Sequence, residues 1–258
     1  MAVHPTALVE PGARIGEGVE IGPYCVVGPQ VALGDGVVLK SHVVVQGDTE
    51  IGTGTVVFPF AVLGEIPQDL KYAGELTRLR IGPGNRIREH VTMNLGTAGG
   101  GGETRVGEGG LFMAGCHVAH DTRVGNRVVV ANSAAIAGHC VIGDDVIIGG
   151  LAGIHQWVRV GRGAIIGALS MVTNDVIPYG LVQGPRGELD GLNLVGLKRR
   201  GTPREEIAAL RAAYAALRAG DGPFQERARA LGGSDSSMVR ELAEFVAGAT
   251  DRQFLTPR

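Results

Sequence analysis

Four of the seven histidines lie near the middle of the chain, at spacings that could bring them to one substrate. His117 and His120 are three residues apart in MAGCHVAHDTR, and Asp121 directly follows His120. His139 and His155 come next along the chain. A neutral imidazole can act as a general base or bind a metal ion, and a neighbouring carboxylate can orient it. Whether these side chains meet depends on how the backbone is wound.

The composition indicates a water-soluble globular protein without an electrostatic preference for polyanions. The 258 residues are 44% hydrophobic, which is enough to bury a core, and the formal net charge is −2. That charge gives no overall attraction to nucleic acid or to an anionic membrane. The sequence has no apolar run of the roughly 18 to 20 residues that span a bilayer, and MAVHPTALVEPG does not resemble a signal peptide. We therefore expect a cytoplasmic protein with no nucleic-acid partner and no membrane span.

The cysteines and glycines point to a regular backbone built from small side chains. Cys25, Cys116 and Cys140 are odd in number and form no CxxC pair, which argues against a disulfide framework or a zinc ribbon. We expect them to be reduced and buried. The chain has 43 glycines but only 4% aromatic residues, which is unusual for a sandwich or a Rossmann core.

An aliphatic residue recurs at every sixth position over most of the chain. The series runs without a polar interruption from Val3 to Leu63, returns at Ile81, Ile87 and Met93, and runs again from Val106 to Val172. This period predicts an all-β solenoid of hexapeptide repeats, in which three hexads make one coil of a parallel β-helix. General crossover statistics favour a right-handed coil. Hexapeptide-repeat proteins as a class are left-handed, and we predict a left-handed parallel β-helix.

Two breaks and a change of composition define the predicted organisation. Insertions fall near 64–80 and 94–105; the first keeps the phase of the repeat and the second, rich in glycine, shifts it by one. We expect the second to be a flexible surface excursion. From about 179 the repeat gives way to helical patterns, with a capping box at Thr202, Pro203 and Glu205 and later helices near 224–231 and 237–248. We predict a β-helix over 1–178 and a small α-helical domain over 179–258.

The predicted winding brings the four histidines to one edge of the solenoid. Residues 18 apart occupy equivalent positions in successive coils, which stack about 4.8 Å apart. His120, Gly138 and Gln156 should therefore form one column. His120 could take the proton of an attacking hydroxyl, and the backbone N–H of Gly138 could stabilise the oxyanion that forms.

A metal site is the alternative for the same cluster. Cys116 and Cys140 adjoin His117 and His139 in sequence. Neighbouring residues of a strand point to opposite faces, however, so these thiols should not share ligands with the histidines. We predict no metal and no cofactor, and keep a metal-dependent enzyme of the carbonic anhydrase type as the less favoured interpretation.

Several motifs together resemble the UDP-N-acetylglucosamine acyltransferase family over nearly the whole chain. They are IGPYCVVGP, KSHVVVQGDTEIG, GEIPQDLKYAGE, AHDTRVGNRVVVAN, IIGG, HQWVRVG and GLKRRG. The resemblance implies a homotrimer with active sites between subunits. It also implies transfer of an (R)-3-hydroxyacyl chain from acyl carrier protein to the glucosamine 3-position of UDP-N-acetylglucosamine, the first step of lipid A synthesis.

The resemblance also assigns roles to residues at matching positions. His120 would be the general base, Asp121 its supporting carboxylate and Gly138 the oxyanion donor. Contacts to the sugar and the acyl chain would come from Gln68, Asp69, Lys71, His117, His139, His155 and Gln156. Asn193, Arg199 and Arg200 would hold the nucleotide and its diphosphate, which a guanidinium fork can bind bidentately.

Two departures from the family pattern bear on specificity. Ala168 stands where relatives that use long acyl chains have glycine, so we expect a preference for chains shorter than fourteen carbons. TMNLGT at 92–97 stands where many members have IHRGT, and this variant resembles relatives that acylate a 3-amino group. The acceptor could therefore be the 3-hydroxyl or the 3-amino sugar.

Other functions remain open at this level. A relative that N-acylates a sugar already carrying a 3-acyl chain normally has an additional N-terminal domain, and a trimer without catalytic activity would bind UDP-sugar without turnover. In the helical tail, Arg211 and Arg218 could contact the acidic carrier protein, although solvated helix charges are the default.

Overall fold

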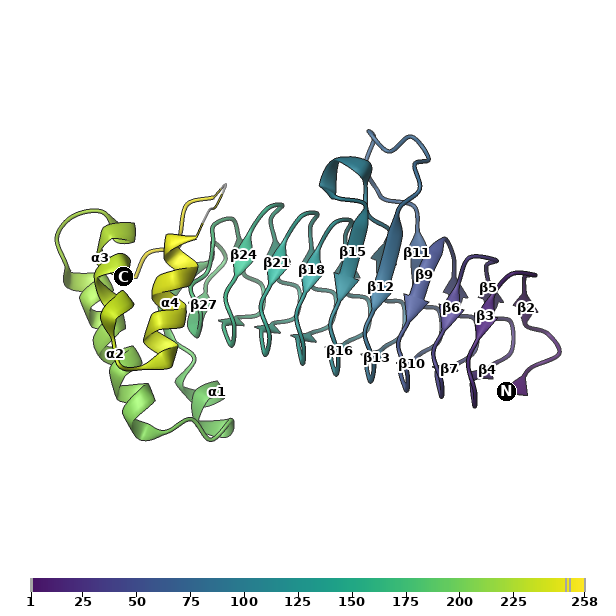
Figure 1. The fold of residues 1–258 in the computed structure, drawn as a ribbon, viewed down its shortest axis with the longest axis horizontal. Helices are drawn as coiled ribbons and strands as arrows, with labels where there is room; N and C mark the ends of the chain where they lie inside the picture. Colours follow the sequence, from purple (N-terminus) through teal and green to yellow (C-terminus); the bar gives the residue numbers. More distant parts are fainter. Residues whose placement is uncertain (1, 249, 251, 258) are drawn as a thin grey trace.

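The chain forms a long parallel β-helix that carries a cluster of helices at its C-terminal end (Figure 1). The computed structural model describes residues 2–248, 250 and 252–257. Each coil contributes one short strand to each of three sheets, here called sheets A, B and C.

From β1 to β26 the strands fall into sheets A, B and C in rotation, and β27 and β28 both join sheet A. Sheet A contains β1 (Ala2–Val3), β4 (Glu20–Ile21), β7 (Val38–Leu39), β10 (Val56–Val57), β13 (Arg86–Ile87), β16 (Leu111–Phe112), β19 (Val129–Val130), β22 (Ile147–Ile148), β25 (Ile165–Ile166), β27 (Gly180–Gln183) and β28 (Glu188–Leu192). Sheet B contains β2 (Leu8–Val9), β5 (Val26–Val27), β8 (Val44–Val45), β11 (Val62–Glu65), β14 (Thr92–Asn94), β17 (His117–Val118), β20 (Ala135–Ile136), β23 (Gly153–Ile154) and β26 (Met171–Val172). Sheet C contains β3 (Arg14–Ile15), β6 (Ala32–Leu33), β9 (Asp48–Ile51), β12 (Arg78–Ile81), β15 (Glu103–Val106), β18 (Arg123–Val124), β21 (Val141–Ile142) and β24 (Arg159–Val160).

The six-residue period places one aliphatic side chain of each strand inside the prism. Ile51, Ile87, Val118 and Ile148 are fully buried, as are the three free cysteines. The predicted inward register and the predicted burial of the cysteines are confirmed. Burying a side chain of this size contributes about 1.5–3 kcal/mol, so the repeated core supplies most of the stabilisation.

Both insertions leave the stacking of the coils intact. Ile81 pairs with Ile51 on one side and with Val106 on the other, so the ladder of sheet C continues past each insertion. The two insertions rise together from one edge of the solenoid (Figure 1). The second contains a short 3₁₀ helix, η1 (Ala98–Gly100).

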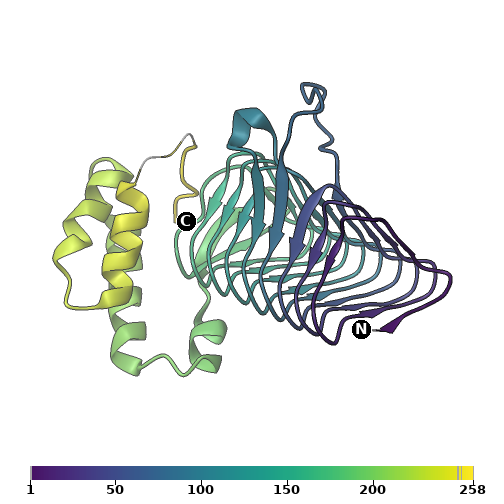
Figure 2. The same cartoon turned by 45° about the vertical axis from the view of Figure 1, so that its right-hand side comes forward.

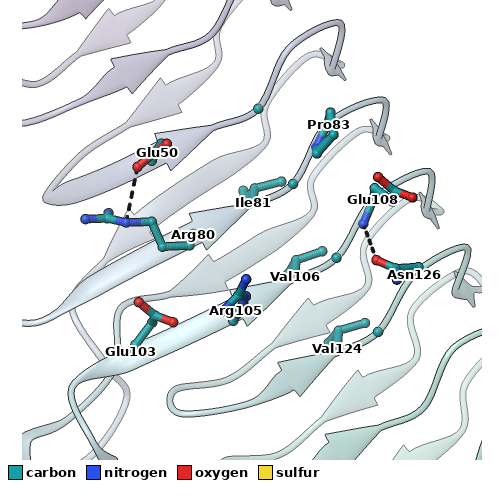
Figure 3. A pocket seen from close by; sticks show the side chains of 14 residues that line it. Glu50, Arg80, Ile81, Pro83, Glu103, Arg105, Val106, Glu108, Val124 and Asn126 are labelled. Atoms are coloured by element: carbon teal, nitrogen blue, oxygen red, sulfur yellow. Dashed lines mark hydrogen bonds and ion pairs between the residues drawn. The ribbon is translucent and has the colours of Figure 1, made fainter.

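The outward faces of the three sheets differ in chemistry. Outward positions in sheets A and B are mostly apolar, among them Val38, Val56, Val129, Ile147 and Ile165 in sheet A and Leu8, Val26, Val44, Val62 and Met171 in sheet B. Sheet C instead presents Arg80, Arg105 and Arg123 on adjacent strands. Figure 3 looks onto this face, where Arg80 pairs with Glu50 at 3.3 Å across a shallow hollow of about 640 Å³.

The C-terminal region differs in detail from the prediction. Sheet A does not end at 178, because β27 continues it and β28 pairs with β27 antiparallel. The helices that follow are α1 (Leu194–Arg199), α2 (Arg204–Ala219), α3 (Phe224–Ala230) and α4 (Ser237–Ala247), with the 3₁₀ helix η2 (Leu231–Gly233) between the last two. They stand beside the end of the solenoid (Figure 2).

The predicted capping box at Thr202, Pro203 and Glu205 is wrong. Pro203 is the N-cap of α2, and no side chain caps this helix. Ser236 caps α4 instead, accepting a hydrogen bond from the Val239 amide. Among the helices that the structure describes, none is long and apolar enough to cross a membrane.

The side chain of Asn85 links two successive coils next to the insertions. Its amide nitrogen donates to the carbonyls of Gly82 and Gly107 at 2.7 and 2.8 Å, and its side-chain oxygen accepts from Gly110 N–H at 2.7 Å. The side chain is fully buried.

We expect Asn85→Leu to lower the free energy of unfolding by about 3 kcal/mol or more. Three backbone groups would lose a hydrogen bond to the Asn85 amide, at about 1–3 kcal/mol for each one left unpaired, and Gly82 O would keep the bond from the Thr55 hydroxyl. Denaturant unfolding at one fixed protein concentration measures this. Arg14→Gln, at an exposed outward position of sheet C, should stay within about 0.5 kcal/mol of wild type. An equal, small effect of both substitutions would contradict the bridging role.

Candidate active site

His120 and Asp121 form a buried dyad at the corner between sheets B and C. His120 Nδ1 lies 2.8 Å from Asp121 Oδ2, and both residues are 5% exposed. A carboxylate can only accept, so this contact places the imidazole proton on Nδ1. The other ring nitrogen, Nε2, is then left with a free lone pair. This is the arrangement that a general base requires.

The second insertion clamps the carboxylate of this dyad. The Thr97 amide donates to Asp121 Oδ1 at 2.8 Å, and the Thr97 hydroxyl donates to Oδ2 at 2.6 Å. The Asp121 amide donates to Thr104 Oγ1 at 2.8 Å. A side chain at Gly100 would come within 2.0 Å of the carboxylate carbon, so the loop can lie this close only with glycine there.

The structure therefore corrects the prediction that this loop is a flexible excursion. Thr97, Gly100 and Thr104 were missed by sequence reasoning. The one signal for them was the shift of the repeat phase across the insertion, which shows where the loop lies but not what it touches.

Gly138 lies directly beneath the His120 ring. A Cβ at this position would meet His120 Cε1 at 2.6 Å and Nε2 at 2.7 Å. The column predicted from the spacing of 18 thus brings the two residues into contact. Among the described residues, no protein acceptor is found for the Gly138 N–H.

A second histidine extends the site along the same corner. The rings of His139 and His120 meet edge to face at 5.0 Å, and His139 Nδ1 lies 3.7 Å from Asp121 Oδ2. Burial lowers the pKa of His139; Asp121 and the more distant Asp69 raise it in part, and His120 and Lys71 lower it further. The imidazole of His139 therefore stays neutral down to a lower pH than an ordinary histidine does.

Trp157, the one tryptophan in the sequence, stacks on His139. The ring centroids are 3.8 Å apart with an interplanar angle of 4°, and the indole remains 43% exposed. Asp121, His139 and Trp157 occupy the same corner position in successive coils, each with φ between 60° and 66°. Sequence reasoning missed Trp157, although its spacing of 18 from His139 was available.

His117 lies beside the dyad on β17. Its Nδ1 is 2.7 Å from the hydroxyl of Thr92 on the adjacent strand. Burial, and then the charge of His120, lower its pKa. His155 and Gln156 are exposed, and His155 Nδ1 lies 2.7 Å from Arg252 Nη2.

The first insertion supplies the remaining nearby polar groups. Asp69 Oδ1 accepts from the Lys71 amide at 3.0 Å, and Gln68 and Lys71 are exposed. Glu75 ties this loop to the second insertion, because its carboxylate accepts from the Ala98 amide at 3.2 Å. Asp69 raises the pKa of His139 and Lys71 lowers it, so the charges of this loop act on that ring.

Four predicted residues lie away from the dyad. Asn193 caps α1 by accepting from the Gly196 amide, and donates to the carbonyl of Gly163 at the corner between sheets C and A, both at 2.9 Å. Arg199 is the last residue of α1, and Arg200 is its C-cap. In Figure 1, α1 lies at the edge of the solenoid opposite the insertions. Ala168 is exposed in the turn between β25 and β26. One chain therefore does not bring these residues to His120.

The comparisons with known proteins agree on one family. The model described as "Udp N-acetylglucosamine O-acyltransferase; Domain 2" matches residues 175–255, and the bacterial transferase hexapeptide model matches 12–47 and 139–174. An acyl-[acyl-carrier-protein]–UDP-N-acetylglucosamine O-acyltransferase of Paracoccus denitrificans is 66% identical over 78% of this chain and 77% of its own length. One of the same name from Caulobacter vibrioides is 52% identical over 100% of this chain and 98% of its own. This chain belongs to the UDP-N-acetylglucosamine O-acyltransferase family.

Solved structures of the family share the whole fold. A crystal structure of a UDP-N-acetylglucosamine acyltransferase superimposes with a TM-score of 0.96 at 40% identity and covers 100% of both chains. The enzyme from Campylobacter jejuni gives 0.94 at 38% identity, over 99% of this chain and 100% of its own. The predicted fold, a left-handed β-helix with a small helical domain, is confirmed.

The same cluster offers three groups that a metal ion could use. Ligand atoms of His120, Asp121 and His139 lie within 4.8 Å of one another. Both Asp121 oxygens already accept hydrogen bonds from Thr97, however, which competes with metal coordination. Cys116 and Cys140 point into the core, where burial raises the pKa of each thiol to about 12.

The contact between Gly138 and His120 yields a direct test. Gly138→Ala should reduce kcat by roughly 10²-fold or more, because the added methyl must displace the ring that acts as base. The fold should be retained, because overpacking of this kind costs about 1–3 kcal/mol and Gly138 has no left-handed backbone angle that alanine would strain.

Steady-state kinetics of acyl transfer, with a thermal melt of each protein, provide the readout. Gly232→Ala is the control, because a Cβ there meets open space in the helical domain. A Gly138→Ala enzyme with kcat within threefold of wild type would contradict this account of the glycine.

Proposed function

We propose that this chain transfers an (R)-3-hydroxyacyl group from acyl carrier protein to the glucosamine 3-position of UDP-N-acetylglucosamine, the first step of lipid A synthesis. The observation that carries the proposal is the buried dyad, in which Asp121 holds the proton of His120 on Nδ1 and leaves Nε2 free. Relatives named acyl-[acyl-carrier-protein]–UDP-N-acetylglucosamine O-acyltransferase match this chain over nearly its full length.

The chemistry is a single acyl transfer through a tetrahedral intermediate. The sugar 3-hydroxyl attacks the thioester carbonyl while His120 Nε2 takes its proton. The carbon–sulfur bond then breaks, and the imidazolium returns the proton to the thiolate of the carrier's prosthetic group. Asp121 stabilises the imidazolium throughout, and proton transfer of this kind contributes roughly 10²–10⁴ in rate.

Gly138 has two roles in this proposal. Its missing side chain leaves room for the His120 ring, and its N–H can donate to the oxyanion of the intermediate. Loss of one such donor typically costs about 2.7–4 kcal/mol of transition-state stabilisation. The donor stabilises the oxyanion this strongly only in a buried site, where water does not compete for the hydrogen bond.

Substrate contacts would come from both sides of the corner. His117, His139 and Gln156 lie along the solenoid, and Gln68, Asp69 and Lys71 come from the first insertion. A neutral imidazole donates a hydrogen bond from one ring nitrogen and accepts one at the other. This combination suits the hydroxyl and amide groups of a sugar. The lowered pKa values of His117 and His139 keep these rings neutral near pH 7.

The nucleotide end of the site requires a second copy of the chain. Asn193, Arg199 and Arg200 lie at a corner away from His120, so a neighbour must supply the arginines that would bind the diphosphate. The apolar outward faces of sheets A and B offer two surfaces on which neighbours can pack. We propose a homotrimer, in which each subunit meets one neighbour through each face. Both substrates are water-soluble, which fits a reaction in the cytoplasm.

The acceptor atom is open between hydroxyl and amine, and Asn94 is the residue to examine. Met93 is fully buried in the core, so it cannot contact a substrate. Asn94 is 4% exposed and donates to the carbonyl of Ile66 at 3.1 Å, while its side-chain oxygen has no partner among the described residues. That oxygen could accept from a sugar hydroxyl or a sugar amine, so the two acceptors have to be compared directly.

The proposal is tested by product identification. The purified protein is incubated with UDP-N-acetylglucosamine or its 3-amino analogue and a mixture of (R)-3-hydroxyacyl carrier proteins, followed by mass spectrometry. We expect one acylated sugar nucleotide, and His120→Gln should lower kcat by roughly 10²–10⁴. Light scattering should report three chains per particle. Turnover with neither acceptor, together with stoichiometric zinc or iron, would replace this proposal by the metal-dependent alternative.

We propose that the methyl group of Ala168 limits the length of the acyl chain. Ala168→Gly should move the preferred donor to a longer chain, since removing a methyl from a closed tunnel end relieves about 1–3 kcal/mol of overpacking. Competition between ten-, twelve- and fourteen-carbon donors measures the shift. A wild-type enzyme that is fastest with the fourteen-carbon donor would contradict the assignment.

A further inference from the structure

The end of the chain returns to the β-helix as a short segment, residues 252–257, here called the strap. Two backbone hydrogen bonds seat it: Asp175 N–H donates to Gln253 O at 2.8 Å, and Leu255 N–H donates to Asp175 O at 2.9 Å. Phe254 is 7% exposed and packs against Phe224 and Phe245. These contacts give the strap one defined register on the last coil.

The side chain of Asp175 also stabilises the junction between the strap and the last coil. It is fully buried and accepts from the backbone N–H of Arg159 at 2.8 Å and from the guanidinium of Arg159 at 2.7 Å. The hydroxyl of Thr250 donates to it at 2.6 Å, just before the strap. A buried carboxylate that accepts several hydrogen bonds resists displacement, so Thr250 is held in place just before the strap.

The strap places Arg252 against His155. Arg252 Nη2 lies 2.7 Å from His155 Nδ1. A guanidinium has only donors, so a contact this short requires a lone pair on Nδ1. The carbonyl of Gln156 lies 3.3 Å from the same nitrogen and would favour the opposite tautomer. The shorter, charge-assisted contact decides between the two, because an Nδ1–H would point at a cation.

We infer that Arg252 is a positioning residue that holds His155 in the neutral tautomer with its proton on Nε2. Among the described residues, Nε2 of His155 has no protein partner, so this N–H can donate to an oxygen of the bound acyl donor or sugar. This role rests on the proposed function, whereas the tautomer itself does not. The two histidines of the site then differ in kind: His120 presents a lone pair to the substrate, and His155 presents a donor.

The tautomer can be measured without any substrate. Long-range ¹H–¹⁵N correlation spectra of protein labelled at histidine, recorded at a pH where His155 is neutral, identify which ring nitrogen carries the proton. His155→Gln assigns the signal. We expect the Nε2–H form in the wild type and a mixture, or the Nδ1–H form, in Arg252→Leu. An Nδ1–H form in the wild type would overturn the inference.

Kinetics test the positioning role. Arg252→Leu should raise KM for one of the two substrates roughly tenfold with kcat within twofold, because a group that only positions a binding contact affects binding more than chemistry. Arg252→Lys, which keeps a donor, should recover most of the loss. Arg229→Leu, an exposed arginine of α3, is the control and should match wild type.

The two measurements separate the possible failures. A shifted tautomer with unchanged KM and kcat would overturn the positioning role. Unchanged spectra and kinetics in Arg252→Leu would overturn the contact itself. If the wild type acylates no sugar at all, the proposed function fails, and the spectra still decide whether Arg252 sets the tautomer.

Discussion

The carboxylate of Asp121 is the point on which the site depends. It is buried, and a buried charge is tolerated only where hydrogen bonds replace its lost hydration. Thr97 supplies two of these bonds from the second insertion and His120 supplies a third. The same set of bonds orders the loop, orients the imidazole and determines which ring nitrogen is free. Each of these features would be lost if the carboxylate were removed.

The β-helix brings the other groups to that carboxylate by repetition of one coil. At the corner between sheets B and C, successive coils place Asp121, His139 and Trp157 in left-handed backbone conformations. Such conformations cost about 1–2 kcal/mol for residues with a side chain. Here the cost is offset by ring stacking and by the contact of His139 with Asp121. His120 and Gly138 lie one coil apart in the neighbouring column. The His120 ring therefore contacts the glycine.

The sequence predicted most of the features that repeat, Trp157 being an exception, and missed the ones that do not. A period of six and a spacing of 18 follow from the geometry of the coil, so the inward residues and the His120 and Gly138 column could be derived. Thr97 and Gly100 belong to a loop without periodicity, and their contacts with Asp121 depend on how that loop folds back. The amide of Asn193 joins α1 to Gly163, a contact that no local pattern predicts, while its place at a ligand stays a prediction. The capping box failed because Pro203, which precedes the helix, cannot offer a side-chain acceptor.

The central claim is that Asp121 acts by holding the proton of His120 on Nδ1, and Asp121→Asn addresses it most directly. The asparagine amide would donate to Nδ1 and so move the imidazole proton to Nε2, which removes the lone pair that acts as base. The measurement is kcat for acyl transfer, with circular dichroism to show that the β-helix is retained. The account predicts a fall on the order of 10²–10⁴ with the fold intact. A folded variant with kcat within threefold of wild type would contradict it.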